Sequence, residues 1–214
     1  MIRNLLILGL LGACIVAIGE SFLHYSSRVM MEAEAFQLFK HVSITHLKIG
    51  HFISVFGLAF YSAGYLGIYK MLKSGHENLA RTVLILSFIA FSIGGIWIGS
   101  RAMVGNLVHM QENIDPISYK LLIEMYDTHY EILVQILRIV IVLLSLIFST
   151  TIIIYHTSFK KWMALFNPFL ILIIILLIGL ALPELGKFVI PALMNITHII
   201  FFSLAIFQTN GSLK

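Results

Sequence analysis

Glu20 and His24 are the two residues whose types and spacing most directly predict chemistry. They stand four residues apart where the first long apolar run ends, so a helix would carry both on one face. A carboxyl group at the edge of hydrocarbon is costly, and it usually faces a protein interior, a partner charge or a water-filled cavity. A carboxyl–imidazole pair can transfer protons and can supply two ligands of a metal site. The pair therefore predicts a polar site inside a membrane protein.

Other polar and ionisable side chains are predicted at the depth of this pair, all in one half of the membrane. Because they lie near the ends of apolar segments, we expect them to meet around one cavity. We expect acid–base chemistry from the carboxyl and imidazole groups, namely Glu20, His24, His46, Glu184 and His198. We expect ligand binding by the guanidinium and amide groups, namely Arg101, Gln135, Arg138 and Asn195.

A divalent metal is the alternative to proton transfer at this site. Glu20 and His24 are spaced as two ligands from one helix, and His46 and His198 are candidates for the remaining positions. His46 and His51 are five residues apart, about 140° around a helix, so both cannot face one ion. The chain has no His-Glu-x-x-His sequence. The metal and proton-transfer interpretations both stay open.

Two arginines lie where hydrocarbon is expected. Arg138 continues a polar helix face whose other members are Glu124, Thr128, Glu131 and Gln135. It can reach lipid headgroups, form an interior salt bridge or bind an anionic ligand. Arg101 is expected to point into the bundle, either in a structural pair with Glu20 or Asp127 or in a functional role.

The composition is that of a polytopic membrane protein. Of the 214 residues, 59% are hydrophobic and 11% are charged, whereas soluble proteins carry about 25% charged residues. The single cysteine, Cys14, excludes an intramolecular disulfide and a thiolate zinc cluster. The net charge of +4 is spread over loops rather than gathered in a patch, so nucleic acid is not an expected partner.

We predict an all-α fold with six transmembrane helices in one domain, residues 1–214. The spans are expected at about 4–23, 46–69, 82–104, 132–155, 163–182 and 188–208. Residues 24–45 are amphipathic, which predicts a segment on the extracytoplasmic membrane surface. Asp115 and Pro116 predict the start of a helix that continues to about Tyr155, and a helix of this length must project beyond the membrane. We expect a tight turn from Pro183 to Lys187.

Basic residues set the predicted orientation. One side of the membrane is predicted to hold seven basic residues and a single acid, Glu77, whereas the other side holds seven basic and nine acidic residues. The seven are Arg3, Lys70, Lys73, Arg81, Lys160, Lys161 and Lys214. By the positive-inside rule this side is cytoplasmic. We therefore expect a multi-pass protein of the cell membrane with both termini in the cytoplasm and the polar site in the extracytoplasmic half.

The layout resembles that of uncharacterised bacterial six-pass membrane protein families of similar length. The resemblance is carried by Ile18-Gly19-Glu20, by Gly57-Leu58-Ala59-Phe60-Tyr61, and by Asn167-Pro168 ahead of Pro183-Glu184. It implies a bacterial inner-membrane location, and it assigns neither an activity nor a catalytic residue.

Three functions fit these observations. The first is binding or chemical modification of an amphiphilic, lipid-like ligand by Glu/His acid–base or metal chemistry, with membrane lipids as partners. The second is a small proton-coupled transporter that acts as a homodimer, with Glu20 as the coupling carboxylate. The third is a structural or sensory subunit whose polar groups only hold helices together. An apolar cytoplasmic half favours the first over the second.

Overall fold

Four long apolar runs of the sequence form four long helices. The computed structural model describes residues 1–24 and 36–209, and every element within those ranges is helical. The four helices are α1 (Ile2–His24), α2 (Ile44–Leu72), α3 (Glu77–His109) and α4 (Pro116–Ile154). Each is long and apolar enough to cross a membrane. The described residues are therefore all-helical, with helices that suit a membrane protein, as the composition predicts.

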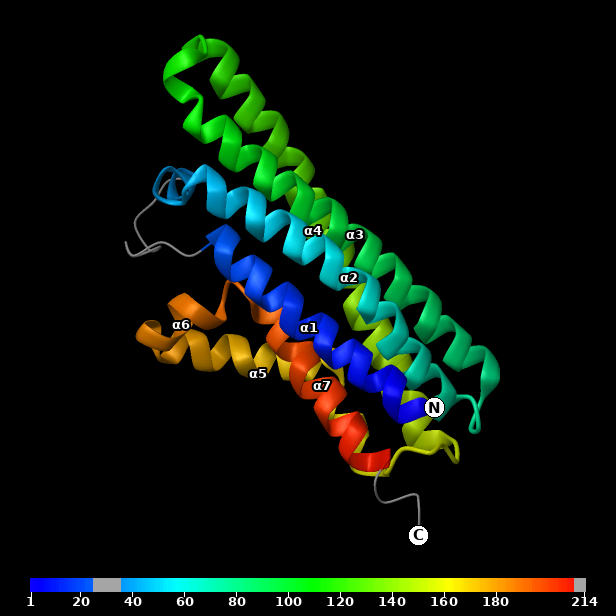
Figure 1. The fold of residues 1–214 in the computed structure, drawn as a ribbon. Helices are drawn as coiled ribbons and strands as arrows, with labels where there is room; N and C mark the ends of the chain where they lie inside the picture. The colour runs from blue at the N-terminus through cyan, green and yellow to red at the C-terminus, as the bar shows by residue number, and fades with distance from the viewer. Residues whose placement is uncertain (25–35, 210–214) are drawn as a thin grey trace.

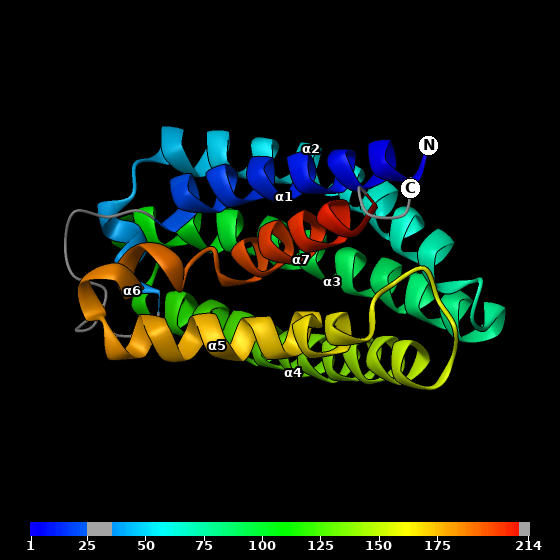
Figure 2. The ribbon, with the colours of Figure 1, turned by 90° about the horizontal axis from the view of Figure 1, so that it is seen from below.

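Shorter elements complete the bundle, and the helices lie in three layers. These elements are η1 (Gln37–His41), η2 (Gln111–Asn113), η3 (Lys161–Phe166), α5 (Pro168–Ala181), α6 (Pro183–Val189) and α7 (Leu193–Thr209). Helices α1 and α2 run along one side, α4 and α5 along the other, and α3 and α7 between them (Figures 1 and 2). This arrangement leaves α4 and α7 on opposite sides of a central space.

Close packing of α1 on α2 depends on glycine. A Cβ atom at Gly64 would lie 2.8 Å from the Cα of Gly9 and 2.6 Å from the Cζ of Phe202 in α7. Small residues let helix backbones approach in a membrane, where van der Waals packing drives association. Gly9 and Gly64 therefore let the backbones of α1 and α2 approach closely.

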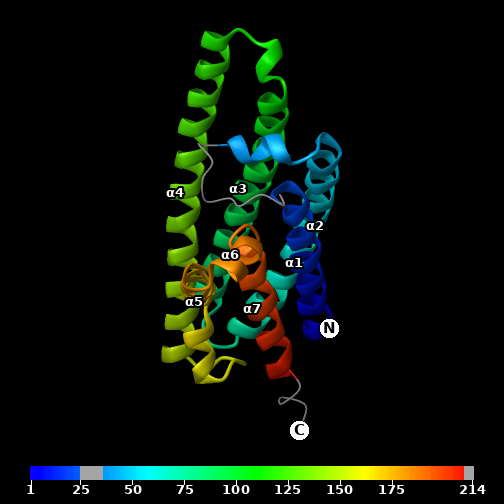
Figure 3. The ribbon, with the colours of Figure 1, turned by 90° about the vertical axis from the view of Figure 1, so that its left-hand side faces the viewer.

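The α3–α4 hairpin projects beyond the other helices (Figure 3). Helices of 33 and 39 residues are about 50 and 58 Å long at 1.5 Å per residue, against a hydrocarbon core of about 30 Å. Asp115 caps α4 by accepting a hydrogen bond from the backbone N–H of Ser118 at 2.9 Å, and Pro116 occupies the first turn. The predicted start and length of this helix are confirmed.

The C-terminal third does not form the two regular transmembrane helices that were predicted at 163–182 and 188–208. Helix α5 has only 14 residues, about 21 Å. Helices α6 and α7 meet at an angle of 81°, and together they qualify as one broken span or a re-entrant segment. The predicted tight turn at Pro183–Lys187 is wrong, because Pro183 at the first helical position starts α6. Four helices, or five with this bent pair, can cross the membrane by length and composition.

The start of α1 and the end of α7 lie at the same end of the bundle (Figure 3). Lys161 lies at this end, where its Nζ donates to the carbonyl oxygens of Ile152, Ile153 and Tyr155. A cation there satisfies the free carbonyls at the C-terminus of α4. Most of the predicted amphipathic segment, residues 25–35, lies outside the described residues, and residues 37–41 form η1.

Candidate functional site: a cavity between the helices

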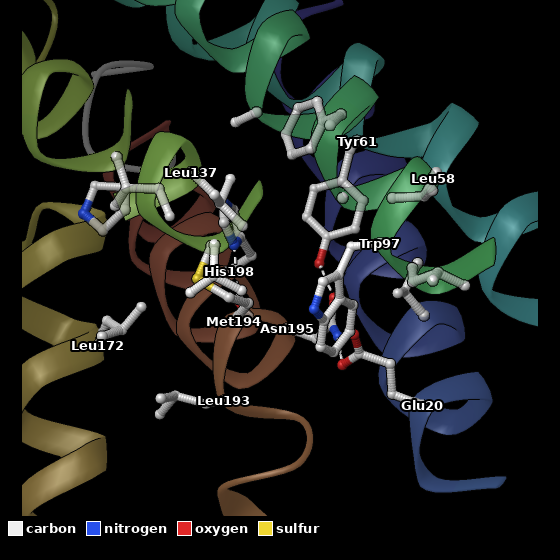
Figure 4. Close-up of a pocket in the computed structure, with 18 of the residues that line it drawn as sticks. Glu20, Leu58, Tyr61, Trp97, Leu137, Leu172, Leu193, Met194, Asn195 and His198 are labelled. Carbon is white, nitrogen blue, oxygen red and sulfur yellow. Dashed lines mark hydrogen bonds between the residues drawn. The ribbon is translucent and has the colours of Figure 1, made fainter. Parts of the chain in front are cut away.

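A cavity of about 390 Å³ lies inside the bundle. Its walls come from α1 to α5, from α7 and from the backbone that joins α6 to α7 at Ile190 and Pro191. Irregular backbone at membrane depth is tolerated where it lines a cavity. In Figure 4, Glu20, Tyr61 and Trp97 gather on one side of the cavity, opposite Leu137, Leu172 and Leu193. The cavity thus has a polar wall and an apolar wall.

Glu20 is buried in the polar wall and is hydrogen-bonded to α7. The side-chain amide of Asn195 donates to Oε2 of Glu20. The Oδ1 atom of Asn195 accepts a hydrogen bond from the hydroxyl of Tyr61 at 2.5 Å. All three side chains are at most 5% exposed. One amide therefore joins α1, α2 and α7 at the cavity and fixes the position of the carboxyl group.

His198 forms a second link between α2 and α7, one turn deeper. Its Nδ1 lies 2.7 Å from the carbonyl oxygen of Met194, and its Nε2 lies 3.1 Å from the hydroxyl of Tyr65. A carbonyl can only accept, so Nδ1 carries the proton and Nε2 accepts from the Tyr65 hydroxyl. Both ring nitrogens of His198 are thus occupied by protein groups.

His24 is held in the same tautomer. Its Nδ1 lies 3.0 Å from the carbonyl oxygen of Glu20, and its Nε2 lies 3.0 Å from Nε of Arg101. Because a guanidinium only donates, Nε2 must be the acceptor and Nδ1 the donor. His24 is therefore neutral in this arrangement, and its role is to orient Arg101.

Arg101 is buried among aromatic rings. Its guanidinium carbon lies 5.0 Å from the ring centroid of Phe39, 5.2 Å from that of Trp97 and 5.6 Å from that of Tyr130. Such distances give cation–π attraction. The predicted pairing of Arg101 with Glu20 or Asp127 is wrong for the residues the structure describes, since no carboxylate there lies within 4.0 Å of it.

Arg138 lines the cavity from α4. In residues 1–24 and 36–209 its guanidinium forms neither a hydrogen bond nor an ion pair, and the side chain is exposed. The predicted interior salt bridge is therefore absent there. Gln135 does not line the cavity; it is exposed and donates to Oε1 of Glu131 at 2.5 Å.

Five of the nine predicted site residues do not line the cavity, namely His24, His46, Arg101, Gln135 and Glu184. His46 is exposed near the start of α2, where its ring packs edge-on against Phe22 at 5.4 Å. Glu184 forms an ion pair with Lys187 at 2.5 Å, and its side chain is 92% exposed. Neither lines the cavity. The four predicted metal ligands, Glu20, His24, His46 and His198, are not brought together, and within the described ranges no three such side chains form a metal-binding group.

Aromatic residues of the site were not among the predicted candidates. Tyr61 and Tyr65 are four residues apart on α2, and Trp97 precedes Arg101 by four on α3. These are the spacings that singled out Glu20 and His24. Polar-tipped aromatic residues one turn apart inside a span, or one turn from a buried arginine, are the signal that could have identified them.

The chain matches the model of one protein family over residues 1–210. The chain belongs to DUF6796, a family of unknown function. No curated protein and no solved structure matches it. The function of this DUF6796 chain is therefore argued from the cavity itself.

Proposed function

We propose that the protein binds an amphiphilic, lipid-like molecule within the bundle. The observation that carries this proposal is the cavity of about 390 Å³, whose lining is mostly aliphatic and aromatic but includes the fixed Glu20 carboxyl group. Small-molecule sites are concave, mainly apolar and oriented by a few polar groups, with volumes of about 300–1,000 Å³. The site has each of these properties.

The shape of the cavity supports an elongated ligand. Its lining runs from Ser87 to Ile98 on α3 and from Tyr130 to Leu144 on α4. At 1.5 Å per residue these stretches are about 16 and 21 Å long, similar to the roughly 15 Å half-thickness of a hydrocarbon core. An acyl or prenyl chain within one leaflet has this length and direction.

The hydrogen bonds favour binding over histidine-based catalysis. A histidine that acts as a general base on a ligand, or that binds a metal, needs one ring nitrogen facing that ligand or metal. Both nitrogens of His24 and of His198 contact protein groups instead. Glu20 is the remaining predicted acid–base group at the cavity, so any proton transfer to a bound ligand would fall to its carboxyl group.

The membrane setting of the proposal follows the charge pattern. We propose six passes, with α5 and the bent α6–α7 pair as the fifth and sixth, in a bacterial cell membrane. Both termini would be cytoplasmic, because the basic loops lie at the end of the bundle where α1 starts and α7 ends. The ligand would then come from the extracytoplasmic leaflet, on the side of Glu20.

Lipid analysis of purified protein tests the proposal. The protein is extracted in a mild detergent, and its bound lipids are compared by mass spectrometry with the bulk lipids of the same membranes. We expect one amphiphile class to be enriched, at up to one molecule per chain. The proposal would be contradicted if the copurified lipids had the same composition as the bulk membrane and were removed progressively by detergent washing. Such lipids would only surround the protein as annular lipid.

A further inference from the structure

Arg101 is a buried charge that has no ion pair with the described residues. The residue is 8% exposed, and its one hydrogen bond to the described residues goes to neutral His24. A buried cation is normally paired, because removal from water costs several kcal/mol that only an anion or a full set of acceptors offsets. The chain leaves this requirement unmet in residues 1–24 and 36–209.

The surroundings of Arg101 orient its guanidinium and leave its terminal nitrogens available. Nε is engaged by His24, while the rings of Phe39, Trp97 and Tyr130 flank the group. Neither terminal nitrogen has a hydrogen-bond partner in the described part of the chain. A guanidinium held in this way presents two parallel N–H groups, the geometry that recognises a carboxylate or phosphate.

Arg101 does not itself line the cavity, but it contacts two residues that do. Trp97 and Tyr130, which flank the guanidinium, both line the cavity. The Nε1–H of Trp97 is buried without a hydrogen-bond partner among the described residues. The carboxyl group of Glu20 is held by Asn195. Among the described residues, the indole N–H of Trp97 and the terminal nitrogens of Arg101 thus have no acceptor.

We propose that the ligand of the cavity is an anionic amphiphile whose carboxylate or phosphate is bound by Arg101. This proposal rests on the proposed function and deepens it by assigning the charge of the head group and the residue that binds it. The apolar chain extends from Arg101 past Trp97 and Tyr130 into the cavity. Arg138 also lines the cavity, but it is less suited to this role, because its side chain is exposed and can extend to water or lipid headgroups.

The test uses probes with one alkyl chain and three head groups: a carboxylate, a phosphate and a neutral alcohol. Their Kd values are measured by calorimetry on the purified full chain in a neutral detergent. We expect the better anionic probe to bind about 10- to 100-fold more tightly than the alcohol, as for hydrogen bonds to a charged group. Which of the two anions binds better identifies the head group as a fatty-acid-like carboxylate or a phospholipid-like phosphate.

Variants assign the preference to a residue. Arg101→Gln should remove the preference for the anionic probes and leave the affinity for the alcohol within about twofold. Arg101→Lys should retain part of the preference for the anions, because the charge is kept but the bidentate geometry is lost. The matched control is Arg81→Gln, which alters a surface ion pair with Glu77 and should change neither value. The head-group comparison on the unaltered protein needs no variant to fold.

The outcomes separate this inference from the proposed function. Equal affinity for the alcohol and both anions would overturn the anionic head group and leave amphiphile binding intact. Absence of binding by all three probes would instead contradict the proposed function. Loss of the preference in Arg138→Gln but not in Arg101→Gln would place the anion on α4 and overturn the assignment. Glu32 and Glu34 belong to residues 25–35, which lie outside the described ranges. A rise in anion affinity when both are changed to Gln would also overturn the assignment, because it would mean that Arg101 pairs with a carboxylate of its own chain.

Discussion

Gly94 offers a way to fill the cavity without disturbing the helices. It lies on the cavity wall in α3, and a Cβ built there meets no atom within 4 Å. A leucine at this position therefore extends into the space proposed for the ligand chain. If its four side-chain carbons displace four methylenes of the ligand at about 0.8 kcal/mol each, binding weakens by about 3 kcal/mol. This equals a rise in Kd of about two orders of magnitude.

The assay is calorimetric titration of Gly94→Leu with a short-chain amphiphile that is monomeric in water. Its methylenes then move from water into the cavity, so their burial contributes fully to the measured binding free energy. Thermal stability should not fall, because leucine favours a helix over glycine by up to about 0.8 kcal/mol. The matched control is Gly99→Leu on the same helix, which lies outside the lining and whose Cβ would meet His51 Cε1 at 3.7 Å. Unchanged affinity in a folded Gly94→Leu protein would refute binding in this cavity.

Three further predictions concern packing, the polar wall and topology. Gly64→Ala should destabilise the protein by about 1–3 kcal/mol, measured by thermal unfolding in detergent, because the added Cβ overlaps α1 and α7; unchanged stability would contradict the close packing. Asn195→Leu should lower the free energy of unfolding by about 1–3 kcal/mol, because it leaves the buried carboxyl group of Glu20 and the hydroxyl of Tyr61 without their hydrogen-bond partner. An unaltered melting temperature would show that these hydrogen bonds do not stabilise the protein. In a background without Cys14, a cysteine at Ser74 should react only with a cytoplasmic thiol reagent and one at Asn113 only with an external reagent, and labelling of both from one side would contradict the six-pass orientation.

The sequence predicts the long helices well because their signals are local. Apolar runs mark α1 to α4, and Asp115 with Pro116 marks the start of α4 before any tertiary contact is known. The C-terminal elements are less predictable. Apolar residues around the α6–α7 break read as one span, but a bend of 81° depends on how the two segments pack around a cavity.

In the candidate site, too, local signals could be predicted from the sequence and tertiary contacts could not. Glu20, Asn195 and His198 could be selected because polar groups inside apolar segments are costly and need partners. Their actual partners, Tyr61 and Tyr65, depend on how α2 rotates against α7, which spacing along one helix does not determine. Depth along the membrane is also insufficient, since Glu184 and His46 were expected at the level of Glu20 but do not line the cavity.

An experimental structure of the full chain in lipid nanodiscs, with native lipid present, tests the central claim most directly. We expect elongated density between α3, α4 and α7, with its polar end beside Trp97 and Arg101 and its chain directed along the bundle toward Leu144. A cavity closed by contact of Leu137 and Leu172 with Trp97, with density only on the outer surface of the bundle, would contradict it.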